Sequence, residues 1–169
     1  PTAVLTPVPR GATLTNPIAQ LARRLAVGQT TLAYDPTTGL LRSVLRELTI
    51  PITSQTLVFS KTSLQSRVIT ARTPRALYFN DTVYVGYVPD GTLLELAVVD
   101  PEAGAVFYTI AQTPGARPRL VTNLDCVRCH TTTATHGLPG FLLRSVFTRP
   151  DGQVAPNTRS FITDQTSPL

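Results

Sequence analysis

Two thiols and an imidazole lie within five consecutive residues of this 169-residue chain, at Cys126, Cys129 and His130, in the pattern C-x-x-C-H. On one turn of helix the two sulfurs can form thioethers with the two vinyl groups at one edge of a porphyrin. The imidazole that follows then points towards the central iron as an axial ligand. The pattern predicts one covalently attached haem c, with Cys126 and Cys129 as tethers and His130 as proximal ligand.

The residues before the motif are typical of a helix start. Thr122 and Asp125 stand at the spacing of a capping box, so we expect a short helix to begin here. Cys126 and Cys129 are the only cysteines in the chain, and the motif uses both.

Three other chemistries fit the same residue types. Cys126, Cys129, His130 and His136 together would make a Cys2His2 zinc set, although a His directly after the second Cys is cramped for tetrahedral closure. A thioredoxin-like C-x-x-C belongs between a strand and a helix, whereas a loop ending in Arg117-Pro118-Arg119 precedes this one. A structural disulfide across two residues would be strained. We therefore favour haem.

The composition is that of a folded domain with a sizeable core. Hydrophobic residues make up 42% and charged residues 15% of the chain, which excludes a strongly solvated, disordered protein. No apolar run approaches the roughly 20 residues that span a bilayer. Residues 1–9 lack the charged start and apolar centre of a signal peptide. Because covalent haem requires an oxidising compartment, we expect a mature exported protein, periplasmic or otherwise extracytoplasmic.

The net charge of +5 comes almost entirely from arginine, and Lys61 is the only lysine. These cations are spread along the chain without a dense block or interleaved aromatics, so we expect no nucleic-acid partner. A basic surface does favour encounter with an acidic redox partner, because charge steers association.

We expect an α+β fold with two short N-terminal helices, an antiparallel β-meander and a short haem-binding helix or loop region. Residues 1–15 are rich in Pro and Thr and predict an extended arm. Asn16 and Pro17 are typical of a helix start, and Gly28 ends the apolar repeat that follows. A second helix is expected from Gly39 to Leu48, before Pro51.

Alternating apolar residues predict the meander. Strands are expected at residues 56–59, 76–79, 82–88, 93–99 and 105–111, joined by turns such as Asn80-Asp81. Glu95 is the one charge in an otherwise apolar strand, and we expect it to face outward or to pair with an arginine. Six aromatic residues form either an aromatic wall beside a porphyrin or ordinary strand packing: Tyr78, Phe79, Tyr84, Tyr87, Phe107 and Tyr108.

Beyond the motif, residues 141–147 predict one further strand, and residues 153–169 are loose and polar. The expected organisation is therefore an arm at 1–15, a single haem-binding domain at 16–152 and a loose segment at 153–169.

The motif and its continuation through Gly137-Leu138-Pro139-Gly140-Phe141-Leu142 resemble small soluble cytochromes c. In those proteins a Gly-Pro-x-Leu segment follows the motif, and its proline carbonyl holds the proximal His. The resemblance implies that Pro139 accepts a hydrogen bond from the ring N–H of His130. It covers only this stretch, because Leu138 separates Gly137 from Pro139 and the body is a β-meander.

Two further segments, residues 57–63 and 75–81, resemble a group of exported bacterial single-haem proteins. Members of that group continue beyond the residue at which this sequence stops.

The motif does not determine the sixth iron ligand. The chain contains no methionine, so the candidates are His136, Lys61, a tyrosine, a partner's residue or none. Two histidine ligands, His130 and His136, would give a low-spin iron suited to electron transfer.

The function expected from these residues is electron transfer by a mono-haem c-type cytochrome. One rival is an accessory, haem-bearing subunit of a larger membrane-associated electron-transfer complex. The others are a haem enzyme and a zinc-binding structural module. No catalytic residue stands out, and an electron carrier or complex subunit is favoured over an enzyme.

Overall fold

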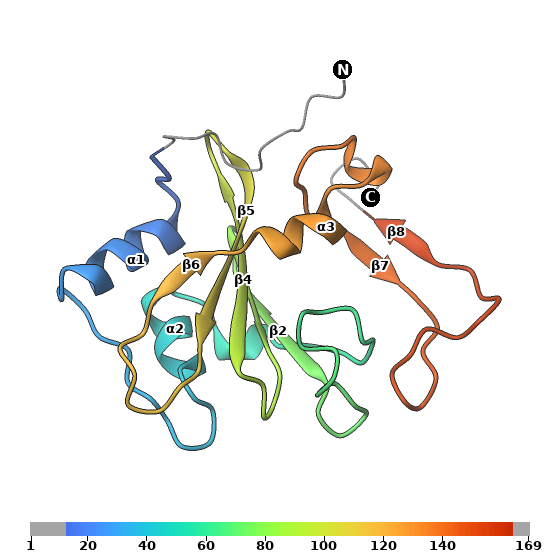
Figure 1. The fold of residues 1–169 in the computed structure, drawn as a ribbon, viewed down its shortest axis with the longest axis horizontal. Helices are drawn as coiled ribbons and strands as arrows, with labels where there is room; N and C mark the ends of the chain where they lie inside the picture. The colour runs from blue at the N-terminus through green and yellow to red at the C-terminus, as the bar shows by residue number, and fades with distance from the viewer. Residues whose placement is uncertain (1–12, 164–169) are drawn as a thin grey trace.

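The computed structural model describes residues 13–163 and shows an α+β fold (Figure 1). The predicted arm at 1–15 therefore lies outside the described residues, except for its last three. Helices α1 (Pro17–Ala26) and α2 (Leu41–Glu47) and the 3-10 turn η1 (Ile52–Ser54) precede the sheet. Both predicted N-terminal helices are confirmed, within two residues at each end.

A six-stranded antiparallel sheet follows, with its strands in chain order. The strands are β1 (Thr56–Val58), β2 (Arg75–Phe79), β3 (Val83–Tyr87), β4 (Leu93–Asp100), β5 (Gly104–Ala111) and β6 (Leu120–Thr122). The predicted meander is confirmed and is longer than expected, because β6 pairs with β5 from Tyr108↔Thr122 to Ile110↔Leu120. This strand is too short for its alternation to be visible in the sequence.

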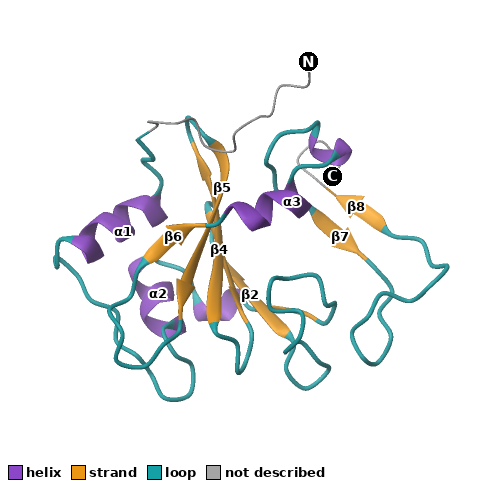
Figure 2. Ribbon diagram, in the orientation of Figure 1, coloured by secondary structure: helices purple, strands orange, loops and turns teal. Residues whose placement is uncertain are grey.

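The C-terminal part of the described chain forms a separate two-stranded sheet. Strand β7 (Leu143–Ser145) pairs with β8 (Phe161–Thr163). The prediction of a strand within 141–147 is confirmed, but the prediction that all of 153–169 is loose is wrong at Phe161–Thr163. Figures 1 and 2 show this hairpin beside α3 (Val127–His130), on the opposite side of the main sheet from α1 and α2.

The sheet has two different faces, which follow from the strand period of two. The helix face, turned to α1 and α2, carries Val85, Leu94 and Ile110, and all three side chains are fully buried. They pack with Leu21 and other apolar residues of the helices in one core cluster. The opposite face, called the motif face below, carries Tyr84, Glu95 and Phe107 and is turned to α3.

A polar cluster fixes α1 to the sheet. Asn16 caps the helix by accepting a hydrogen bond from Ala19 N, and its side-chain amide donates to Asp100 and Tyr108. Asp100 lies at the end of β4, where its two oxygens also accept from four backbone N–H groups. This cluster joins the helix start to the β4–β5 turn.

Within residues 13–163, no helix is long and apolar enough to cross a membrane.

Candidate haem-attachment site

The C-x-x-C-H motif adopts the helical turn that its spacing predicts. The 3-10 turn η2 (Leu124–Cys126) runs directly into α3 (Val127–His130). The residue that begins this helical turn is Asn123, whose side chain accepts from Asp125 N at 2.9 Å. The predicted cap at Thr122 is wrong, because Thr122 belongs to β6 and pairs with Tyr108.

His130 is held by a reciprocal pair of hydrogen bonds with Gly140. Its ring Nδ1 lies 3.0 Å from Gly140 O, and Gly140 N donates to His130 O, also at 3.0 Å. A carbonyl oxygen only accepts, so Nδ1 carries the proton and Nε2 of the neutral ring keeps a free lone pair. Burial lowers the pKa of His130, which keeps the ring neutral at pH 7, although the Gly140 bond opposes this shift.

The resemblance to small cytochromes c placed this acceptor at Pro139, and the structure places it one residue later, at Gly140. An oriented imidazole of this kind is what a metal-ligating histidine requires.

His136 lies at the end of a short turn after the motif. The turn η3 (Thr133–Thr135) leads into His136, which is exposed and adopts a left-handed conformation with φ of 54°. Thr135 holds the turn by donating to Thr132 O and accepting from Thr132 N. No hydrogen bond of the His136 ring occurs among the described residues.

The aromatic residues of the meander divide between the two faces of the sheet. Tyr78 and Tyr108 lie in the core on the helix face, and Tyr87 packs against it. Phe79, Tyr84 and Phe107 lie in one cross-strand row on the motif face. Only this second group is available to a ligand bound at the motif.

The row on the motif face contacts the motif itself. The Phe107 ring lies 4.5 Å from the His130 ring, and Phe141 packs on Tyr84 and Phe107 with centroid distances of 5.2 and 6.3 Å. Phe79 stacks on Tyr84 at 5.9 Å and extends the row. Phe107, Tyr84, Phe79 and Phe141 together are called the aromatic row below.

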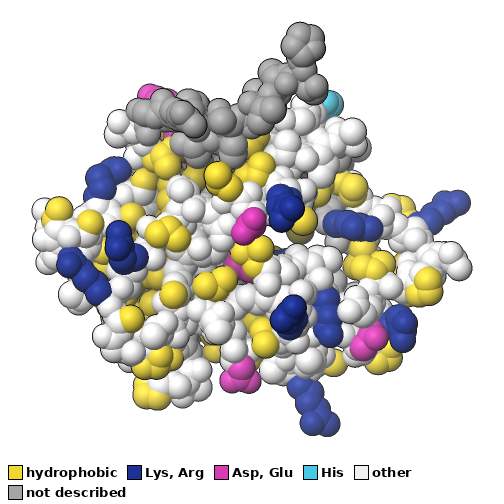
Figure 3. Space-filling model, in the orientation of Figure 1, with side chains coloured by type: hydrophobic (Ala, Val, Ile, Leu, Met, Phe, Trp, Pro, Cys, Tyr) yellow, Lys and Arg dark blue, Asp and Glu magenta, His cyan; other side chains and the backbone are white. Residues whose placement is uncertain are grey.

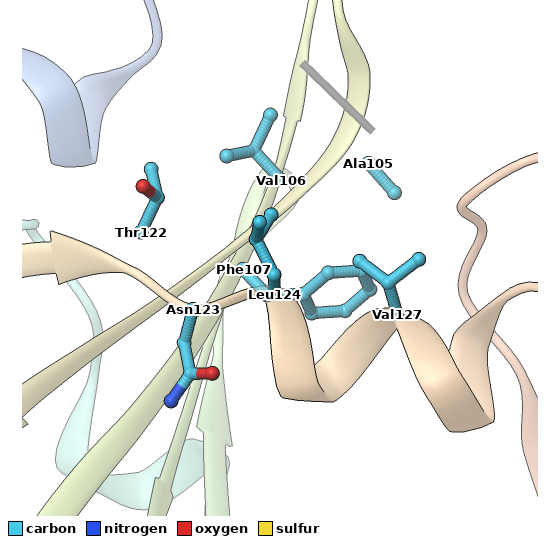
Figure 4. A pocket seen from close by; sticks show the side chains of 7 residues that line it. All are labelled: Ala105, Val106, Phe107, Thr122, Asn123, Leu124 and Val127. Atoms are coloured by element: carbon cyan, nitrogen blue, oxygen red, sulfur yellow. The ribbon is translucent and has the colours of Figure 1, made fainter. Parts of the chain in front are cut away.

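The start of α3 packs closely on β5. Figure 4 shows Val127 and Leu124 beside Phe107, around a cavity of only about 10 Å³. That volume holds at most one water molecule. This side of the motif is therefore closed, while Cys129 is exposed and Cys126 half-buried on the same helical turn.

A charged cluster lies in the next row of the motif face. Arg75 Nη1 lies 3.4 Å from Glu95 Oε2, and Ser63 Oγ donates to Glu95 Oε1 at 2.9 Å. The two charged side chains are only 18% and 16% exposed. The expectation that Glu95 pairs with an arginine is confirmed.

The Cys126 thiol is neutral in this environment. Burial raises the pKa of Cys126 to about 11, and the negative charges of Glu95 and Asp125 act in the same direction. A nucleophilic or redox thiol needs a lowered pKa. A thioether sulfur, by contrast, carries no charge and tolerates burial.

The side chains of a zinc site are not assembled. Within the described part of the chain, no group of three or more His, Cys, Asp or Glu residues is gathered closely enough to hold a metal ion. Cys126, Cys129, His130 and His136 therefore do not form a four-ligand set. The donor set fits haem c, which takes two thioethers and one oriented imidazole from this segment.

Sequence reasoning missed three residues of this site. Arg75 lies directly before the strand predicted at residues 76–79 and was not among the predicted site residues. Phe141 was read only as part of a strand. Gly140 acts through its backbone carbonyl, which no side-chain pattern reveals.

No family model, no curated protein sequence and no solved structure matches this chain.

Proposed function

We propose that this protein is an exported mono-haem c-type cytochrome that acts in electron transfer. The observation that carries the proposal is the state of His130. It follows two cysteines on one helical turn, its Nδ1 is tied to Gly140 O at 3.0 Å, and its Nε2 is unprotonated. This orientation leaves the Nε2 lone pair free to bind a metal ion.

Each residue of the segment has a distinct role in the proposal. Cys126 and Cys129 are the covalent tethers, and His130 binds the iron on one side. Gly140 fixes the tautomer and the rotation of the His130 ring. When bound, the haem would supply a one-electron couple for exchange with redox partners.

The aromatic row supports the same site. Phe107 contacts the His130 ring, and Phe141 packs in turn on Phe107. An apolar ring beside the imidazole lowers the local dielectric around it. We assign these rings to orienting and desolvating the haem ligand.

The thiol and zinc alternatives lose support from the same geometry. A raised Cys126 pKa disfavours thiol–disulfide exchange, and the four potential zinc ligands are not gathered. His136 remains our candidate for the sixth ligand, since it is exposed and its ring has no hydrogen bond among the described residues.

The surface around the motif suits a redox partner with acidic side chains. Residues 117–163 contain six arginines and two aspartates. Figure 3 shows Lys and Arg side chains spread over this face of the molecule, including the part that carries β7 and β8. The proposal predicts that electron exchange with an acidic partner slows as salt is added.

A second candidate, a haem-bearing subunit of a larger membrane-associated assembly, is favoured by the hairpin β7–β8. Its apolar side chains are unusually exposed, with Leu143 at 66%, Phe147 at 64% and Phe161 at 61%. Purification of the natural protein separates the two candidates. A carrier purifies alone, and a subunit purifies with its complex.

The decisive experiment is the absorption spectrum of protein matured in its own host, oxidised and reduced, and then in alkaline pyridine. We expect a c-type haemochrome that resists acid–acetone extraction. The matched variants Cys126→Ala and Cys129→Ala should each lose one thioether, and His130→Ala should change the axial ligation. Protein without haem would overturn the proposal.

A further inference from the structure

The charged cluster on the motif face contains none of the residues that we propose to attach the haem. Arg75 and Glu95 form an ion pair in a largely buried position, at 18% and 16% exposure. The Nε atom of Arg75 is also buried, without a hydrogen-bond partner among the described residues. Placing these charges here costs desolvation energy, which a simple apolar packing would avoid.

The register of the sheet places this pair close to the His130 ring. Glu95 stands opposite Thr109 on β5, and Phe107 stands two residues before Thr109 on the same face. Diagonal neighbours on a sheet are about 7–8 Å apart. Since the Phe107 ring lies 4.5 Å from the His130 ring, the Glu95 carboxylate is on the order of 10 Å from that imidazole.

The field of the pair reaches the motif. Charges separated by on the order of 10 Å still interact appreciably where the space between them is protein rather than water. A carboxylate and a guanidinium act in opposite directions on any charge at the motif. The pair is thus a set of two opposed charges, both within range of the same ligand.

Ser63 and Thr109 complete the surroundings of Glu95. The Ser63 hydroxyl donates to one carboxylate oxygen at 2.9 Å, and the guanidinium lies against the other. These contacts fix the carboxylate in position, so its charge does not rotate away when the charge at the site changes.

We propose that the Arg75–Glu95 pair sets the midpoint potential of the haem held at Cys126, Cys129 and His130. This inference rests on the proposed function. A carboxylate near the iron stabilises the oxidised form, which carries one more positive charge, and so lowers the potential. The guanidinium does the opposite. The midpoint potential therefore depends on the balance between the carboxylate and the guanidinium.

The test measures the midpoint potential by spectroelectrochemistry of the holoprotein, in three single variants. Glu95→Gln keeps an oxygen that accepts from Ser63 and removes the negative charge. In this variant the equilibrium constant for reduction of the haem by a fixed mediator is expected to rise roughly tenfold. For a one-electron couple this corresponds to a midpoint potential about 59 mV higher. Arg75→Gln is expected to shift the constant by a similar factor in the opposite direction. Arg75→Lys keeps the positive charge and is expected to leave the midpoint potential at its natural value.

The matched controls come from the ion pair on the other side of the sheet. Arg24 Nη1 lies 3.0 Å from Glu47 Oε2, between α1 and α2. Glu47→Gln and Arg24→Gln are expected to leave the potential unchanged.

Opposite shifts at the two positions support the inference, because a general loosening of the fold would move both variants in one direction. Shifts of the same sign, or shifts no larger than those of the controls, would overturn it. If one variant loses the natural spectrum, the other variant must shift the potential in its stated direction and by more than the controls. A shift in the other direction then overturns the inference. Absence of covalent haem from the natural protein would overturn the proposed function as well, whereas an intact haem with an unmoved potential would overturn this inference alone.

Discussion

Asp100 is the residue whose replacement should most clearly separate stability from function. Its carboxylate is 1% exposed and accepts five hydrogen bonds. One oxygen accepts from Thr15 N, Asn16 N and the Asn16 side chain, and the other from the N–H groups of Glu102 and Ala103. Asp100→Asn replaces one of these oxygens with an NH2 group. That group then faces three N–H donors at the first position or two at the second, and it can accept from none of them.

The cost follows from the donors left without an acceptor. Hydrogen bonds to a charged group contribute about 1.5–3 kcal/mol each, and an unsatisfied buried donor costs about 1–3 kcal/mol. With partial relaxation we expect a loss of about 3 kcal/mol, which lowers the melting temperature by roughly 6–12 °C for a chain of this size. Asp35, which is half-buried and accepts from Thr37 N and Thr38 N, is the matched control, and Asp35→Asn should cost far less.

The pH dependence gives a second readout of the same residue. Burial alone would raise the pKa of Asp100, but the Asn16 side chain and the backbone N–H groups lower it overall. A lowered carboxyl pKa contributes stability that is present above the unfolded value of 3.8 and is lost as the pH falls through the folded value. The natural protein should therefore lose stability below pH 3.8, and Asp100→Asn should lose less.

Thermal unfolding by circular dichroism, followed together with the visible absorption bands, is the assay. We expect the melting temperature to fall while the native spectrum stays unchanged, because Asp100 lies on the helix side of the sheet, away from the motif. A melting temperature within 2 °C of the natural protein, a change of about 1 kcal/mol or less, would refute the reasoning.

Three further predictions concern the site. His136→Ala is expected to change the spin state of the oxidised haem, and an unchanged spectrum would remove His136 as the sixth ligand. In protein produced without haem attachment, the Cys126 thiol should be alkylated roughly a hundredfold more slowly in the folded state than in urea, because its pKa is about 11 when folded and 9.0 when unfolded. Mass spectrometry measures the two rates, with Cys129 as the internal comparison. Equal folded and unfolded rates at Cys126 would contradict the burial argument. Phe107→Leu should cost about 1–2 kcal/mol in chemical denaturation and alter the visible spectrum, whereas Phe147→Leu, at an exposed position, should do neither.

Local patterns in the sequence determined the elements of this fold. The Asn16-Pro17 start, the apolar repeats and the turn at Asn80 give α1, α2 and the meander within a few residues, because capping and side-chain period are properties of neighbouring residues. The C-x-x-C-H spacing predicted the helical turn at residues 124–130 in the same way, since a single turn is enough to present two thiols and an imidazole.

The short strands β6 and β8 were beyond such reasoning. Leu120–Thr122 and Phe161–Thr163 each contain three residues, too few to show an alternation, and they exist because distant strands offer hydrogen bonds to them. The same holds for the aromatic residues. Their types suggested a wall, but only the register decided that Phe107 faces the motif and Tyr108 faces the core.

The sequence by itself therefore determined which side chains we propose as haem ligands, and the tertiary structure decided what surrounds them. The acceptor for His130 is a backbone carbonyl at Gly140, ten residues away, and it is found only when the chain folds back. The partners of Glu95 come from residues 20 and 32 positions earlier. Such contacts depend on strand pairing and loop closure across the whole domain, and no local pattern of residues encodes them.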